Sequence, residues 1–197
     1  MKLNCGFVGL PNVGKSTLFN ALSNNSIAAE NYPFCTIEPN VGIVEVPDDR
    51  LKVLSKIFSP KKTICNTVEF IDIAGLVKNA HKGEGLGNQF LSQIRSVKVV
   101  VQIIRVFDDK NVTHVENRVD PMDDIEIINT ELVLADLSTV EKLYQKAIKN
   151  TKSGQKEGLP LRELIEKILP PLEEGKALRT ISFNHEESKL LKGIQLL

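Results

Sequence analysis

The stretch from Gly9 to Thr17, which reads GLPNVGKST, constrains this chain more than any other. Its spacing is that of a phosphate-binding loop, in which a glycine and four variable residues precede a glycine, a lysine and a hydroxyl residue. Glycine at positions 9 and 14 permits backbone angles that a β-carbon disfavours, so successive N–H groups can turn inward around phosphate oxygens. A short apolar strand is expected before the loop (3–8) and a helix after it (17–22), whose N-terminal dipole favours an anion. This context predicts a site for a nucleoside triphosphate.

The side chains of this loop have separate predicted roles. Lys15 supplies a positive charge to the β- and γ-phosphates and is a candidate catalytic residue, and the Ser16 hydroxyl is a candidate ligand for Mg²⁺. Asn12 is also a candidate ligand for a monovalent cation such as K⁺. The residues predicted to bind the nucleotide are Asn12, Val13, Gly14, Lys15, Ser16 and Thr17.

The overall composition limits the partners and the cellular compartment that we expect for this chain. Lysine plus arginine equals aspartate plus glutamate, at 25 each, so the overall charge favours neither a nucleic-acid nor a membrane partner. No apolar run approaches the roughly 20 residues that span a bilayer, and the chain enters its first strand without room for a signal peptide. The 3 cysteines lack metal-ligand spacing and are expected to be reduced thiols. We therefore expect a cytoplasmic protein with no membrane partner.

Strand and helix patterns alternate through the first half of the chain. This alternation predicts an α/β fold with a parallel sheet and helices on both faces, and the phosphate-binding loop makes it a P-loop NTPase fold. The last strand of this region is the richest in β-branched residues, so we expect it to be central. The expected strands are 3–8, 41–46, 67–72 and 97–106, and the expected helices are 17–22, 47–58 and 89–94.

The spacing of the apolar residues changes near Asp123. From there to about Thr151, and again from Leu161 to Leu172, apolar residues recur with a 4-3-4-3 spacing, which predicts two helices with narrow apolar seams. The turn-rich residues between them favour an antiparallel helical hairpin inserted in the nucleotide-binding domain. A short strand is expected at 178–183 and a closing helix at 185–197. The predicted domains are therefore 1–122 for the first part of the nucleotide-binding domain, 123–184 for the coiled-coil insertion and 185–197 for a return helix to the first domain.

Two further positions predict a nucleotide-sensing switch. Asp72 begins an Asp-x-x-Gly motif at the end of a strand and could hold Mg²⁺ beside Ser16, directly or through water, while the Gly75 N–H could approach a γ-phosphate. Thr36 lies in a polar segment where a switch could close on Mg²⁺. The alternatives are a structural turn and an ordinary loop hydroxyl. The predicted metal ligands are Ser16, Thr36 and Asp72, and the predicted switch residues are Thr36, Gly75 and Leu76.

Several separate motifs together resemble the Obg-like ATPase (YchF) family of translation-factor-type P-loop NTPases. They are the 9–17 loop, residues 31–40, the run DIAGLVK at 72–78 with the glycine-rich segment 83–90, and NTELVLADL at 129–137. The resemblance covers essentially the whole chain. It implies an ATP-preferring hydrolase with a GTPase-like fold, with ATP or GTP and the ribosome or ribosomal RNA as partners.

The same resemblance implies elements beyond Leu197, namely a base-reading strand, a last strand and helix, and a C-terminal TGS domain. GTPase-type domains usually read the base through an Asn-Lys-x-Asp motif, and no such element occurs here. These residues therefore leave base selectivity open.

Position 76 bears on the rate of hydrolysis. Ras-like enzymes place a glutamine there to orient the attacking water, whereas this chain has Leu76, which cannot hydrogen-bond to water. Either another group orients the water or intrinsic hydrolysis is slow. The family shares this substitution, and a histidine that matches His114 has suitable chemistry, because imidazole can exchange protons or hydrogen-bond near neutral pH. The alternatives are a loop-packing role for His114 and a role for His81 instead.

Two interpretations of function follow. The first is a Mg²⁺-dependent switch that binds and slowly hydrolyses ATP or GTP. The second is a non-hydrolysing module in which bound nucleotide sets the conformation of a helical hairpin that binds RNA or protein. A small-molecule kinase is disfavoured because no arginine-rich lid is evident. A lysine cluster towards the hairpin tip could contact RNA phosphates, although a solvated helix face is the simpler interpretation; the cluster comprises Lys142, Lys146, Lys149, Lys152 and Lys156.

Overall fold

The computed structural model describes residues 3–23, 40–73, 75, 86–109, 111–116, 118–152, 159–194 and 196–197. The chain divides into two compact units, the first comprising Met1–Gly75 and Ser96–Val119 and the second Leu76–Arg95 and Asp120–Leu197. Within the described ranges, no helix is both long and apolar enough to cross a membrane.

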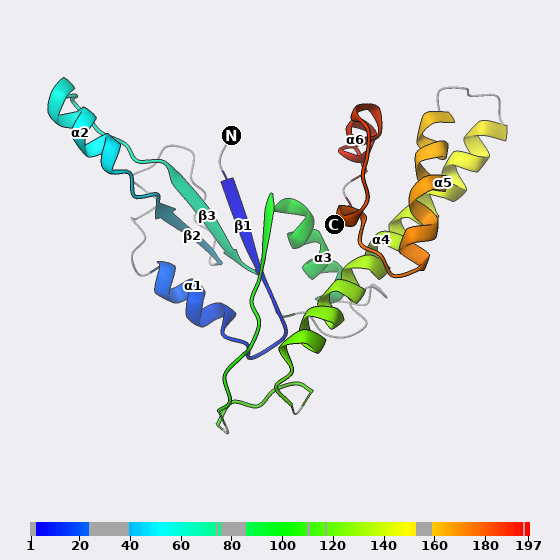
Figure 1. Ribbon diagram of the computed structural model, residues 1–197, viewed down its shortest axis with the longest axis horizontal. Helices are drawn as coiled ribbons and strands as arrows, with labels where there is room; N and C mark the ends of the chain where they lie inside the picture. The colour runs from blue at the N-terminus through cyan, green and yellow to red at the C-terminus, as the bar shows by residue number, and fades with distance from the viewer. Residues whose placement is uncertain are drawn as a thin grey trace. The chain divides into compact units, whose positions relative to one another are not determined.

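A four-stranded sheet forms the first unit, with strand order β2-β3-β1-β4 (Figure 1). The strands are β1 (Leu3–Val8), β2 (Val41–Glu45), β3 (Thr67–Asp72) and β4 (Val99–Gln102). Strand β1 pairs in parallel with both β3 and β4, so the carboxyl ends of these three strands meet at one edge of the sheet. The phosphate-binding loop and Asp72 both follow from that edge, the usual place for ligands in such sheets.

The expectation of an all-parallel sheet is wrong at β2, which pairs with β3 in the antiparallel sense. Between them, helix α2 (Asp49–Phe58) lies beyond the ends of the two strands rather than across a face of the sheet (Figure 1). The chain therefore turns back on itself instead of making the crossover that a parallel pair needs. An antiparallel edge strand on an otherwise parallel sheet is common in α/β folds.

The prediction that the β-branched run is a central strand is also wrong for the described sheet, where β4 occupies an edge. Val99 and Val100 remain 40% and 42% exposed. The regular strand is also shorter than expected, although the amide of Ile103 still donates to the Val8 carbonyl at 2.7 Å. Side-chain type predicted the strand correctly, but it does not specify how many neighbours a strand has.

Helix α1 (Lys15–Ser23) contacts β2 and β3 and buries Phe19. Beneath it, the rings of Phe7 and Phe70 stack with centroids 5.3 Å apart, which ties β1 to β3. Helix α2 begins as predicted, because the Asp48 carboxylate caps it by accepting from the Arg50 N–H at 3.0 Å.

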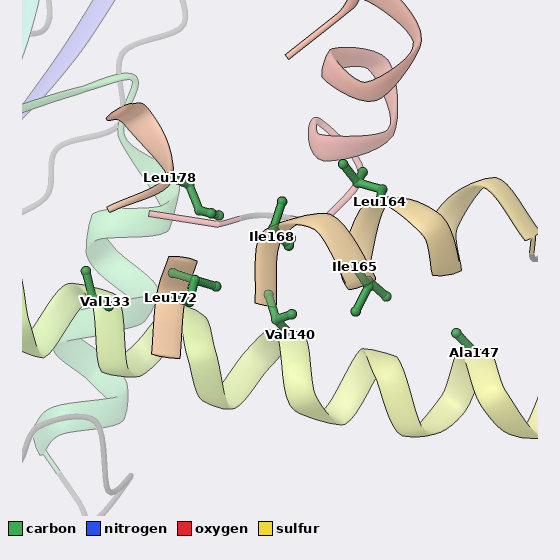
Figure 2. Close-up of a cluster of buried hydrophobic side chains, with 8 residues drawn as sticks. All are labelled: Val133, Val140, Ala147, Leu164, Ile165, Ile168, Leu172 and Leu178. Atoms are coloured by element: carbon green, nitrogen blue, oxygen red, sulfur yellow. The ribbon is translucent and has the colours of Figure 1, made fainter. Parts of the chain in front are cut away.

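The second unit is helical. It contains α3 (Leu86–Ser96, up to Arg95), α4 (Pro121–Lys152), α5 (Leu159–Glu173), a short 3₁₀ helix η4 (Leu178–Thr180) and α6 (His185–Leu191). Helices α4 and α5 pack along the two predicted apolar seams, whose side chains meet in Figure 2. The buried residues of this core are Val133, Val140, Ala147, Leu164, Ile165, Ile168, Leu172 and Leu178.

Two expectations about the end of the chain differ from the structure. The strand expected at 178–183 is instead a turn of 3₁₀ helix, because the Thr180 amide and hydroxyl both donate to the Ala177 carbonyl, at 3.0 and 2.7 Å. The closing helix ends at Leu191, and Leu190 and Leu191 pack against the α4–α5 core. The predicted return helix is thus part of the second unit in the structure.

Candidate functional site

The phosphate-binding loop connects β1 to α1 and has the backbone that its sequence predicts. Gly14 has a φ of 101°, which glycine adopts readily and other residues avoid. Asn12 also has a positive φ, at 61°, a conformation that asparagine tolerates better than most side chains. The Leu18 amide donates to the Gly14 carbonyl at 3.0 Å, so the helix begins immediately after the loop. Val13 is buried, whereas Asn12, Ser16 and Thr17 are exposed.

Gly9 is required for a different reason, namely space. A β-carbon at this position would lie 2.5 Å from the Ile103 carbonyl oxygen and 3.0 Å from Cγ2 of Val13. The loop therefore leaves β1 in close contact with the backbone that follows β4.

We expect Gly9→Ala to destabilise the protein by about 1–3 kcal/mol, because the added methyl meets backbone that cannot rotate away. Urea unfolding followed by circular dichroism measures this change. Gly193→Ala is the matched control, since a β-carbon there meets nothing closer than 3.4 Å. Equal midpoints for the two variants would contradict the steric role of Gly9.

Lys15 is buried at the base of this loop, with 7% of its surface exposed. Its Nζ donates to the Gly9 and Leu10 carbonyls at 3.1 and 2.8 Å. Burial lowers the pKa of Lys15, and the nearby Asp72 carboxylate partly opposes that shift. The ammonium is thus held by the loop's own carbonyls at the start of α1, where a positive charge would attract phosphate oxygens.

Ser16 and Asp72 meet even though they are far apart in sequence. The Ser16 hydroxyl donates to Oδ2 of Asp72 at 2.7 Å, which joins the first turn of α1 to the end of β3. Gly75 approaches the same place, since a β-carbon on it would lie 3.1 Å from Lys15 Nζ and 3.2 Å from the Pro11 nitrogen. Four of the predicted site residues, Gly14, Lys15, Ser16 and Asp72, are therefore grouped at one edge of the sheet.

His114 is connected to the phosphate-binding loop through the residue before it. The side-chain amide of Asn12 donates from Nδ2 to the Thr113 carbonyl at 3.0 Å. His114 is buried, with 4% of its surface exposed, and its Nδ1 accepts from the Glu116 amide at 3.2 Å. Because Nδ1 accepts, the proton of a neutral imidazole belongs on Nε2, so the ring can donate through Nε2–H.

Several predicted residues lie outside the described ranges. These are Thr36, Leu76 and His81, together with Lys156 of the lysine cluster. Among the described residues, no group of three or more His, Cys, Asp and Glu side chains could hold a metal ion. Of the three predicted metal ligands, Ser16 and Asp72 lie within the described ranges, and their side chains are in contact.

One buried residue near this site was not predicted from the sequence. Arg105 follows β4 and is almost fully buried, with 1% of its surface exposed. The only sequence signal was a single charged residue within a run of aliphatic ones, and such an arginine is usually exposed at the end of a strand.

Known proteins resemble this chain along its whole length. Residues 4–149 match the family model described as 50S ribosome-binding GTPase. The chain is 53% identical over 197 residues to the ribosome-binding ATPase YchF of Bacillus subtilis (strain 168), and 50% identical to the protein of that name in Escherichia coli O157:H7. Each match covers 100% of this chain and 54% of the relative, so the chain spans about half the length of the curated relatives that it matches.

A solved structure of a YchF protein has a similar fold. The Schizosaccharomyces pombe YchF GTPase matches with a TM-score of 0.79 and 36% identity, over 99% of this chain and 53% of that one. This similarity confirms the expected α/β fold of P-loop, GTPase-like type. The family match contains the whole phosphate-binding loop, Asp72 and His114. The chain therefore belongs to the family of 50S ribosome-binding GTPases and, within it, to the YchF group of Obg-like ATPases.

Proposed function

We propose that this chain is the nucleotide-binding part of a molecular switch that binds and slowly hydrolyses ATP. The observation that carries the proposal is the Ser16–Asp72 hydrogen bond of 2.7 Å beside the buried Lys15 ammonium, at the carboxyl edge of the sheet. The names of the relatives favour ATP, whereas the family description favours GTP. ATP is therefore the first nucleotide to test and GTP is the alternative.

The phosphate side of the site supports this assignment. The loop from Asn12 to Thr17 would wrap the phosphates with its N–H groups, and the dipole of α1 would favour their negative charge. Lys15 would exchange its two carbonyl partners for phosphate oxygens on binding. Hydrolysis in such a site depends on holding the phosphates and stabilising their charge rather than on covalent chemistry by the protein.

The residues present fit Mg²⁺. A hard cation prefers oxygen ligands and keeps several waters, so one hydroxyl and one carboxylate beside a triphosphate suffice. Ser16 Oγ and Asp72 Oδ2 are close enough to share one ion, and we propose both as ligands, with Thr36 as a third when the switch closes. When bound, Mg²⁺ would neutralise charge on the β- and γ-phosphates.

We expect Asp72→Asn to raise the Mg²⁺ concentration for half-maximal hydrolysis by about 10- to 100-fold, because an amide offers the cation no charge. A Mg²⁺ titration at saturating ATP measures the shift. Asp49→Asn is the matched control, since Asp49 is an exposed carboxylate that pairs with Lys52 on the surface of α2. An unchanged Mg²⁺ dependence in Asp72→Asn would remove this residue from the metal site.

A slow rate is proposed because Leu76 stands where a water-orienting glutamine is usual. His114 is proposed as the group that compensates. Its Nδ1 accepts from Glu116, so it would act by donating from Nε2–H to the attacking water or to a phosphate oxygen. It would act as a hydrogen-bond donor rather than as a general base. Gly75 and Leu76 are proposed as switch residues because Gly75 ends the Asp-x-x-Gly motif that begins at Asp72 and Leu76 comes next.

The binding partner and the cellular location are proposed from the names of the relatives. Their names describe ribosome binding, and we propose the ribosome or ribosomal RNA as the partner and the cytoplasm as the location. The exposed lysines Lys142, Lys146 and Lys149 of α4 offer a surface for RNA phosphates. K⁺ is proposed as an additional ion at Asn12, which would have to exchange its contact with Thr113; equal rates in KCl and NaCl would exclude it.

Single-turnover hydrolysis with ATP and with GTP tests the proposed function. Phosphate release at a slow but measurable rate, dependent on Mg²⁺, is the expected result. Nucleotide binding without phosphate release over hours would instead support a non-hydrolysing module that changes its partner binding with nucleotide. A phosphorylated small-molecule acceptor would identify a kinase.

A further inference from the structure

Arg105 is the most deeply buried charged side chain of the first unit among the described residues, with 1% of its surface exposed. It follows the end of β4 and borders a cavity of about 670 Å³. A buried guanidinium loses its hydration, which is costly unless each of its donors finds an acceptor. The position of these acceptors therefore indicates what the side chain does.

All three nitrogens of the Arg105 guanidinium bond to carbonyls of one short loop, residues 107–112. Nε donates to the Phe107 carbonyl at 3.1 Å, Nη2 to the Asp109 carbonyl at 3.2 Å and Nη1 to the Val112 carbonyl at 2.9 Å. The guanidinium also lies over the Phe107 ring, 4.7 Å from its centroid. A planar fork with fixed donor directions suits this arrangement, and a lysine ammonium could not reproduce it.

The loop that Arg105 holds is also tightened by its own hydrogen bonds. The Val112 amide donates to the Asp109 carbonyl at 3.1 Å, and the Asn111 amide donates to Oδ1 of Asp109 at 2.9 Å. Asp109 and Val112 are thus held both by Arg105 and by hydrogen bonds within the loop.

The residues that follow this loop are those that reach the candidate site. Thr113 accepts the hydrogen bond from Asn12 of the phosphate-binding loop, and His114 is the buried imidazole next to it. Only one peptide bond separates Val112, which Arg105 holds, from Thr113. The position of His114 relative to the phosphate-binding loop therefore depends on the loop conformation that Arg105 fixes.

We infer that Arg105 is a positioning residue for hydrolysis, which fixes the 107–112 loop and so holds His114 at the phosphate-binding loop. This inference rests on the proposed function, in which His114 donates a hydrogen bond during hydrolysis. Arg105 itself touches no reacting atom. Its effect on the rate should be large because a displacement of about 1 Å in a reacting group can cost about 100-fold in rate.

The test is a double-mutant cycle with Arg105→Met and His114→Ala, measured by single-turnover ATP hydrolysis. Methionine keeps an unbranched side chain of similar length but loses the fork. We expect Arg105→Met to lower the rate at saturating ATP by about 10- to 100-fold while nucleotide affinity changes by less than about 3-fold. In the His114→Ala background the same substitution should lower the rate no further, because the two residues act as one unit.

Arg50→Met is the control, since the exposed Arg50 guanidinium bonds the Asp48 carboxylate at the start of α2; its rate should equal that of the unaltered chain. Arg105→Lys, which keeps the charge without the fork, should be slowed like Arg105→Met. Hydrogen exchange at the amides of Asn111 and Val112 gives a second readout that needs no hydrolysis, and it should be faster in both Arg105 variants.

The inference would be overturned by an unchanged rate in folded Arg105→Met, by effects of the two substitutions that multiply, or by unchanged exchange in the loop. A slowed Arg105→Met beside an unchanged His114→Ala would also overturn it, because Arg105 would then act by another route. Failure of the proposed function is recognised separately, since the unaltered chain would bind nucleotide and release no phosphate.

Discussion

Lys15→Met is expected to lower ATP hydrolysis by roughly 10²- to 10³-fold, the usual loss when one preorganised donor to a developing charge is removed. Lys15 Nζ lies at the loop, held by the Gly9 and Leu10 carbonyls. To bind phosphates, the ammonium has only to exchange these carbonyl partners for phosphate oxygens. Methionine keeps the buried aliphatic stem and removes only the ammonium.

The stability of Lys15→Met should separate a role at the site from a role in folding. Burial lowers the pKa of Lys15, so the folded chain binds its proton less tightly than the unfolded chain does. A buried charged lysine therefore costs stability at neutral pH, and its removal should not destabilise the protein by more than about 1 kcal/mol. Lys52→Met, at an exposed lysine paired with Asp49, is the control. Hydrolysis at the unaltered rate in Lys15→Met would refute the site.

The parts of this site that could be predicted from sequence are those built from local chemistry. The phosphate-binding loop has a fixed spacing because its glycines and its lysine meet one ligand in one turn of chain. Asp72 was predicted because it begins an Asp-x-x-Gly motif at the end of a strand. That strand pairs with β1, and parallel neighbours present their carboxyl ends together. The seams of α4 and α5 were found because a helical period places their apolar residues on one side.

The features that were missed depend on contacts between distant segments. The direction of β2 depends on where α2 lies relative to the sheet, and a strand pattern has the same period in either direction. Arg105 was missed because its acceptors are backbone carbonyls, which every residue has and no side-chain pattern identifies. The burial of Asp136 was missed because the helical period identifies only the apolar side chains that are buried. The groups that interact with this carboxylate come from three other segments, namely α3, η4 and residue 197.

Asp136 of α4 is buried, with 2% of its surface exposed, and both of its oxygens accept from the Leu197 amide, at 2.9 and 3.1 Å. Burial raises its pKa from 3.8 to about 7, although the Leu197 amide, Arg95 of α3 and Arg179 of η4 each oppose that shift. The charged form is therefore less favourable in the folded chain than in the unfolded one.

The sign of the pH dependence follows from this shift. Between pH 4 and pH 7 the folded chain keeps a proton on Asp136 that the unfolded chain releases, so stability is lost as the pH rises through that range. A shift of about 3 pKa units, at about 1.4 kcal/mol each, corresponds to roughly 4 kcal/mol. Asp136→Asn removes the titrating group and keeps Oδ1 as an acceptor for Leu197. We expect this variant to gain stability relative to the unaltered chain as the pH rises from 4 to 7.

Urea unfolding of both proteins at several pH values measures that difference directly, because contributions from the other titrating groups cancel between them. Glu141→Gln is the control, since Glu141 is an exposed carboxylate on the same helix and its removal should leave the difference flat. A flat difference for Asp136→Asn as well would mean that Asp136 is charged in the folded protein at little cost. Arg95 and Arg179 would then stabilise it far more than burial penalises it, and removing either arginine should restore the pH dependence.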